Sequence, residues 1–150
     1  MIRVQREDFD VGREIENLTR GKTTIGGIVT FVGTVRDAGG ADAIRSMTLE
    51  HYPGMTEDEL TAIEAEANNR WKLEASLIVH RHGKLLPGER IVLVVTAAAH
   101  RAVAFAANEF LVDWLKTKAP FWKQEETPQG THWVEAQDSD DQAAKRWAKG

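Results

Sequence analysis

Two long apolar segments joined by a short loop constrain the fold of this chain more than any other feature. Residues 74–80 (EASLIVH) and 90–98 (RIVLVVTAA) are rich in β-branched residues, as strands are. The loop between them contains the turn sequence Pro87-Gly88 and is too short for the crossover that parallel neighbours need. The two segments are therefore predicted to pair in antiparallel fashion.

Strand-like and helical patterns are interspersed along the rest of the chain. Further strands are predicted at 25–36 and 46–52, which join the first two in one sheet, and weaker ones near 2–5, 121–125 and 132–136. Helices are predicted at 11–20, at 100–118, from a capping box that opens at Thr56, and near 140–147. These elements predict an α+β fold with a largely antiparallel sheet packed by helices.

Composition narrows the class of protein further. With 150 residues, 42% hydrophobic and 28% charged, the chain fits a soluble globular protein with one domain over 1–150. A net charge of -4 makes nucleic acid an unsuitable partner, and the absence of any run of membrane-span length predicts a cytoplasmic protein without a membrane partner. Since there is no cysteine, disulfides and a cysteine nucleophile are excluded, and any sulfur chemistry must use imported sulfur.

The segment LKTKAPFWK carries Lys116 and Lys123, which could either face solvent or form part of an anion-binding site. Lysines in the last turn of a helix favour the helix dipole and usually lie in solvent. Pro120, however, must end the helix that carries Lys116, and the chain then returns with Lys123 beside the apolar Phe121 and Trp122. An amine held against such a wall supplies positive charge to an anion. Spacing alone favours the solvent reading.

Other cationic residues stand where elements end. His100 and Arg101 open the predicted helix, where free backbone N–H groups favour an anion, although a plain surface pair is an equal alternative. Arg36 ends the first long strand. If these residues converge with the two lysines, they would bind a small phosphorylated anion.

His80 and His82 alternate on a strand and share a face, which suggests a metal site. No third ligand stands at a suitable spacing, so no metal is expected. The usual nucleotide-binding and serine-hydrolase motifs are missing as well.

Six blocks of sequence, in order and spanning nearly the whole chain, resemble the large subunit of molybdopterin synthase. The blocks are TFVGTVRD (30–37), LEHYPGMTEDEL (49–60), VHRHGKLLPGE (79–89), AAAHRAVAF (97–105), LKTKAPFWKQE (115–125) and WVEAQDSDDQAAKRW (133–147). The resemblance implies an α/β hammerhead fold with a small additional antiparallel β subdomain.

The resemblance also implies a sulfur transfer that uses no cofactor. A small ubiquitin-like subunit would bring a C-terminal Gly-Gly thiocarboxylate, and cyclic pyranopterin monophosphate would receive two sulfurs as the dithiolene of molybdopterin. Large subunits of this family form a homodimer with one small subunit at each end, which makes a heterotetramer.

By the family pattern, Lys116 and Lys123 fall on the catalytic positions, which also bind substrate. The remaining substrate-binding positions are Thr34, Val35, Arg36, His100, Arg101, Gln124 and Glu125. Lys118 is left out of the site, and Gln137 stands where a relative has arginine. Two alternatives remain open: a non-catalytic module that binds a sulfur-carrier protein or a phosphorylated small molecule, and a generic ester hydrolase that needs no partner.

Overall fold

The computed structural model describes residues 1–37, 39, 43–134, 142 and 145–148. The helices are α1 (Val11–Thr19), α2 (Met55–Arg70) and α3 (Arg101–Thr117). The strands are β1 (Ile2–Gln5), β2 (Gly27–Thr34), β3 (Ser46–His51), β4 (Ala75–Arg81), β5 (Gly83–Leu85), β6 (Arg90–Ala98), β7 (Phe121–Thr127) and β8 (Gly130–Val134).

The strands form two sheets of four strands each. The first sheet has the order β1-β4-β6-β2, in which only the β1–β4 pair is parallel. The second sheet has the order β5-β3-β7-β8 and is antiparallel throughout. The predicted antiparallel pairing of 74–80 with 90–98 is thus confirmed, and so is an α+β fold with an additional antiparallel sheet.

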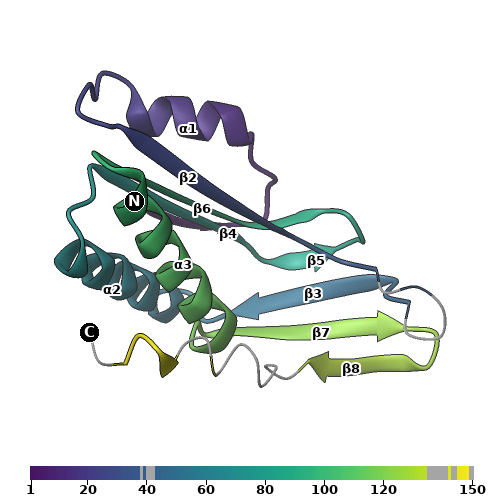
Figure 1. Cartoon of the computed structure of the whole chain (residues 1–150). Coiled ribbons are helices and arrows are strands. Elements are labelled where there is room, and N and C mark those ends of the chain that lie inside the picture. Colours follow the sequence, from purple (N-terminus) through teal and green to yellow (C-terminus); the bar gives the residue numbers. More distant parts are fainter. Residues whose placement is uncertain (38, 40–42, 135–141, 143–144, 149–150) are drawn as a thin grey trace.

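Helices cover both faces of the first sheet. Figure 1 shows α1 on one face and α2 with α3 on the opposite face, while β3, β7 and β8 extend beyond one end of the helices. Asp10 begins α1, because its carboxylate accepts a hydrogen bond from the Arg13 N–H at 3.1 Å. Beneath α1 lies a small core of its own, which includes Leu77, Val79 and Leu93.

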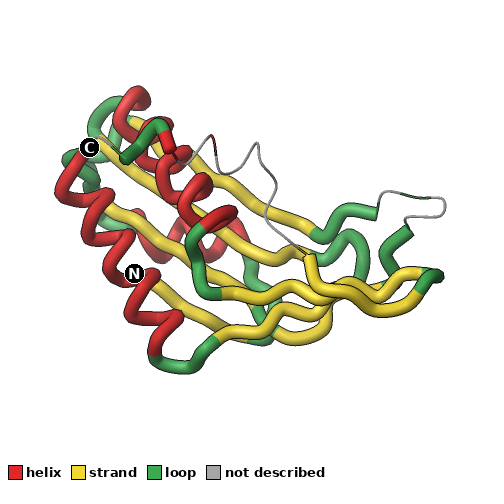
Figure 2. The backbone as a smooth tube through the Cα atoms, turned by 90° about the horizontal axis from the view of Figure 1, so that it is seen from below, coloured by secondary structure: helices red, strands yellow, loops and turns green. Residues whose placement is uncertain are grey.

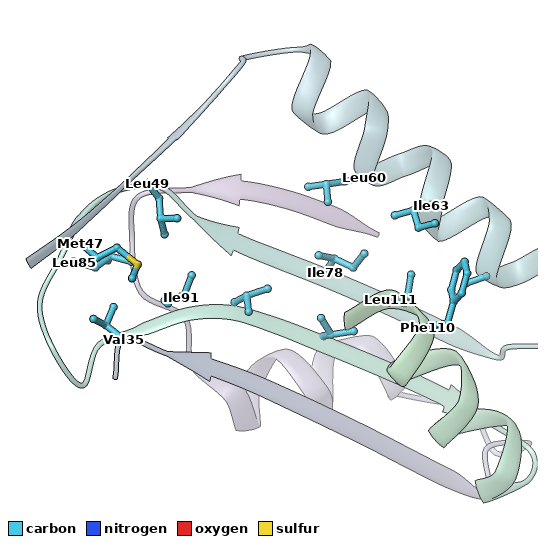
Figure 3. Packing of buried hydrophobic residues seen from close by; sticks show 13 residues of the cluster. Val35, Met47, Leu49, Leu60, Ile63, Ile78, Leu85, Ile91, Phe110 and Leu111 are labelled. Atoms are coloured by element: carbon cyan, nitrogen blue, oxygen red, sulfur yellow. The ribbon is translucent and has the colours of Figure 1, made fainter. Parts of the chain in front are cut away.

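The larger core runs without interruption from the helices into the second sheet. Leu60 of α2 and Leu111 of α3 pack over Ile78 of β4, and the same cluster continues to Leu49 of β3 and Leu85 of β5 (Figure 3). All five side chains are almost completely buried. The second sheet is therefore fixed to the rest of the molecule by packing, which gives the residues it carries a defined position.

One strand prediction needs correction, and one strand was not predicted. Segment 46–52 does not join the first sheet, because β1 takes the free edge of β4 while β3 pairs with β5 and β7 in the second sheet. The three-residue strand β5 was not predicted, since a strand this short carries no usable alternation. In Figure 2, the strands lie roughly along the length of the molecule.

The beginning of α2 also differs from the prediction. Gly54, with a φ of 87°, precedes the helix, and its N–H donates to the Glu57 carboxylate at 3.3 Å. Thr56 is therefore inside the first turn and completely buried rather than capping the helix. Half of the predicted helix at 140–147 and most of the loop 37–43 lie outside the described residues. In the part of the chain that the structure describes, no helix combines the length and apolar character that a membrane span needs.

Candidate active site

The corner between α3 and β7 brings the two predicted catalytic lysines to one region. Lys116 lies in the last turn of α3, and its side chain is exposed. The helix ends at Thr117, and Pro120 directs the chain into β7, which carries a half-buried Lys123. The predicted return of the chain at Pro120 is confirmed.

A buried hydroxyl holds this corner in place. Thr56 donates its Oγ1 hydrogen to the carbonyl oxygen of Pro120 at 3.2 Å, and the same Oγ1 accepts from the Tyr52 N–H at 3.0 Å. The start of α2 is thereby joined to the turn between α3 and β7, which lies 64 residues further along the chain. Without this hydroxyl, the Tyr52 N–H and the Pro120 carbonyl oxygen would lack these partners in a partly buried region.

Strand periodicity directs Lys123 toward the interior of the molecule. In β7, Phe121 and Lys123 share one face because side chains alternate along a strand. Phe121 packs against the large core, and Lys123 is paired in register with Leu49 of β3, whose side chain is buried. Lys123 therefore lies beside Phe121, as predicted, whereas Trp122 alternates to the other face of β7 and is 40% exposed.

His80 of β4 lies beneath the two lysines. Its ring stacks on Phe121, with centroids 3.7 Å apart and planes 15° apart, and only 5% of the residue is exposed. Burial is the largest cause that lowers the pKa of His80 to about 3, and the positive charges of Lys123 and then Lys116 act in the same direction. Both lysines thus act on one imidazole, which also indicates that they lie near each other.

Two further histidines are close to His80. The rings of His51 and His82 are 4.3 Å apart, and His51 lies 6.3 Å from the Phe121 ring. Burial lowers the pKa of His82, and the neighbouring His51 lowers that pKa as well. No local pattern in the sequence indicates that His51 lies beside His82, because the pairing of β3 with β5 and β7 is long-range. Among residues 1–37, 39, 43–134, 142 and 145–148, no group of three or more ligating side chains is arranged to hold a metal ion.

Arg36 follows β2 at the end nearest the second sheet. Val35 is buried and packs with Met47 and Leu85 at that end of the core (Figure 3), with its N–H donating to the Glu89 carbonyl oxygen at 2.9 Å. The side chains of Thr34 and Arg36 are both exposed on either side of it. Val35 therefore anchors the chain, and its two neighbours remain accessible to a ligand.

His100 and Arg101 lie at the opposite end of α3 from Lys116. Both are exposed, and the chain passes Gly26 so closely that a Cβ there would lie 2.0 Å from the Ala99 carbonyl oxygen. Along the axis, about 22 Å separate Arg101 from Lys116, at about 1.5 Å per helical residue. Within one chain, the predicted cationic residues therefore form two groups rather than one.

The remaining predicted positions lie on β7 or beyond the described chain. Glu125 shares the inward face of Lys123, and its carboxylate lies 3.8 Å from the His132 ring nitrogen on β8. Gln124 occupies the other face, in register with Trp133. Lys118, left out of the site by prediction, lines a separate cavity of about 370 Å³ between α2, α3 and Trp147. Gln137 lies outside the described residues.

Comparison with solved structures defines the class of protein. The chain superposes with a TM-score of 0.82 on "Molybdopterin biosynthesis MoaE protein" from Burkholderia ambifaria, at 51% identity and over 98% of this chain and 97% of that one. The fold alone is shared with a complex of subunits 1 and 2 of molybdopterin-converting factor from Helicobacter pylori, at a TM-score of 0.71, 20% identity and coverage of 89% and 90%. The fold is thus that of proteins of molybdopterin biosynthesis.

The family follows from sequence. Residues 4–118 match the family model described as MoaE protein, and the chain is 53% identical to the molybdopterin synthase catalytic subunit of Mesorhizobium japonicum, over 97% of this chain and 92% of the relative. The chain belongs to the MoaE family. The resemblance found in the sequence, and with it the prediction of a molybdopterin synthase catalytic subunit, is confirmed.

Proposed function

We propose that this chain transfers sulfur from the C-terminal thiocarboxylate of a small ubiquitin-like subunit to cyclic pyranopterin monophosphate. The observation that carries the proposal is the pair Lys116 and Lys123, gathered over the buried His80 at the corner of α3 and β7. Since the chain has no cysteine, its own side chains offer charge and protons rather than sulfur. The cytoplasmic location expected from the sequence remains a prediction.

The two lysines have distinct roles in this proposal. The thiocarboxylate sulfur attacks the pterin side chain, an oxygen leaves, and water hydrolyses the acyl group that remains. Lys123, half-buried beside Leu49, orients and polarises the thiocarboxylate. Lys116 is exposed at the end of its helix, and there it stabilises the developing anion and donates a proton.

The lysines are tested by replacing each with alanine and measuring dithiolene formation from thiocarboxylated partner and precursor. We expect Lys116→Ala and Lys123→Ala each to lower the rate on the order of 10²–10³-fold, as the loss of a preorganised charge does. Lys118→Ala is the matched control, because Lys118 lies two residues from Lys116 but faces a different cavity. Near-normal rates in both site variants would sink the mechanism, and partner binding without any turnover by the wild type would favour a non-catalytic module.

We further propose that His100 and Arg101 bind the phosphate of a precursor held by the lysines of a second copy. The support for this proposal is the length of α3, which keeps the two cationic groups about 22 Å apart in one chain. A homodimer can join the start of α3 in one copy to the α3–β7 corner of the other. Arg36, Thr34, Gln124 and Glu125 would complete the pocket from the lysine side.

A further inference from the structure

His80 is a buried imidazole to which the proposed reaction gives no role. Its Nδ1 lies 2.8 Å from the carbonyl oxygen of Arg81. A carbonyl oxygen can only accept a hydrogen bond, so Nδ1 carries the hydrogen and Nε2 keeps its lone pair. Burial keeps the ring neutral, since the pKa of His80 is lowered to about 3. The His80 imidazole is therefore held in a fixed position as the neutral tautomer with its hydrogen on Nδ1.

The stack with Phe121 determines what faces this ring. Phe121 covers the imidazole at 3.7 Å, and Lys123 is the next residue on the same face of β7, about 7 Å further along the strand. The ionisable groups that act on the imidazole come from three elements: Lys123 of β7, Lys116 of α3 and His51 of β3. Among them, Lys123 has the strongest influence. A buried acceptor requires a donor, and an ammonium group has three N–H bonds to offer.

We propose that His80 is a positioning residue for Lys123, whose ammonium group donates one hydrogen bond to Nε2 of the neutral imidazole. That bond fixes the direction of the remaining two N–H bonds, which point to the thiocarboxylate. Because a neutral acceptor stabilises the ammonium form more than the free amine, His80 also keeps Lys123 charged. The inference deepens the proposed function and, in its link to catalysis, rests on it.

The kinetic test compares His80→Phe, which keeps an aromatic ring on Phe121 but removes the acceptor, with His80→Gln, whose amide oxygen can accept. We expect His80→Phe to lower kcat about 10- to 100-fold, the range set by one lost hydrogen bond to a charged group, with KM for both substrates within about two-fold. The alkaline limb of the kcat profile should move to lower pH in His80→Phe and return toward the wild-type position in His80→Gln. Equal kcat and an unmoved limb in His80→Phe would overturn the inference.

A second measurement needs no activity and separates this inference from the proposed function. In protein labelled with ¹⁵N-histidine, nuclear magnetic resonance should show His80 as the neutral tautomer with hydrogen on Nδ1 at pH 7. The Nε2 resonance should shift in Lys123→Ala and stay in place in Lys118→Ala. If the Nε2 resonance of His80 is unchanged in Lys123→Ala, the proposed hydrogen bond between the two residues is refuted. If the wild type shows the expected resonances but no sulfur transfer, only the proposed function is refuted. If His80→Phe fails to fold, this measurement decides the question by itself.

Discussion

At the scale of single residues, burial decides the charge of His80. The imidazole lies between β7 and the core, with Phe121 stacked on it and both lysines near it. Desolvation and two positive neighbours act in the same direction, and both oppose a third positive charge. The residue thus remains neutral through the physiological range, unlike an exposed histidine.

This burial gives the folding stability a defined pH dependence. The pKa of His80 is about 3 in the folded chain and near 6.5 when unfolded, so the unfolded state binds the extra proton between these values. Stability is therefore fully present above pH 6.5 and falls as the pH drops toward 3, by up to about 1.4 kcal/mol per pH unit. Denaturant unfolding of the wild type and of His80→Phe between pH 4 and 7 measures the effect. A slope that is the same in both proteins would contradict it.

Single residues also mark the limit of prediction from sequence. Lys116 and Lys123 were identified through the resemblance, because their spacing alone favoured solvent-facing lysines. The contact between His80 and Phe121 could not be predicted, since the two residues are far apart in the chain and lie in different sheets. The alternation of His80 and His82 raised the question of a metal site, which the lack of a third ligand argued against. It did not indicate that one ring stacks on Phe121 and the other lies against His51.

At the scale of elements, the corner between α3 and β7 depends on α2. The Thr56 hydroxyl of α2 donates a hydrogen bond to the Pro120 carbonyl oxygen in this corner and accepts one from the Tyr52 N–H. A helix, a strand end and a proline turn are thereby fastened by one oxygen atom. The positions of both lysines depend on that turn.

Replacing this hydroxyl should weaken the fold. Thr56→Val keeps the shape of the side chain but leaves the Tyr52 N–H and the Pro120 oxygen without their partner, so we expect a loss of about 1–3 kcal/mol in the free energy of unfolding. Thr61→Val is the matched control on the same helix, because Thr61 is exposed and bonds only back to Glu57. Urea denaturation compares the two. Equal losses would show that the bridge contributes nothing specific.

Most elements could be predicted, and the errors have local causes. Strands 2–5 and 90–98 have the predicted bounds, because alternation and β-branched residues are strong signals there. The start of α2 was misplaced because Thr56 fits a capping pattern that the glycine two residues earlier supersedes. The sheet that accepts β3 is decided by long-range pairing with β7, which no local pattern encodes.

At the scale of the whole molecule, the distance between the two cationic groups raises the question of whether one site is formed by residues of two copies of the chain. One chain carries Lys123 near one end of α3 and Arg101 at the other. If the site forms across a homodimer, a copy with Lys123→Ala and a copy with Arg101→Ala contain between them one intact pair. Such a mixed dimer should recover about half of the wild-type rate, although each variant alone is nearly inactive.

The control for this experiment is a chain that carries both substitutions, combined with a wild-type chain. Both sites of that mixed dimer are damaged if the site forms across copies, so its rate should be close to zero. If the site forms within one chain, the opposite results are expected. The mixed dimer of the double variant and wild type would keep about half of the wild-type rate, and the mixed dimer of the two single variants would be nearly inactive. Purified mixed dimers with two different affinity tags make the comparison direct.

The length of α3 has one more consequence, which concerns how this family can change during evolution. Each residue of a helix turns the next by about 100° and advances it by about 1.5 Å. Deleting one residue between Arg101 and Lys116 would therefore rotate one end of the helix by more than a quarter turn relative to the other, and adding two full turns would lengthen it by about 11 Å. Loops can absorb insertions and deletions. In α3, a change of a single residue would alter both the distance and the relative direction of Arg101 and Lys116, so we expect related chains to keep the length of this helix.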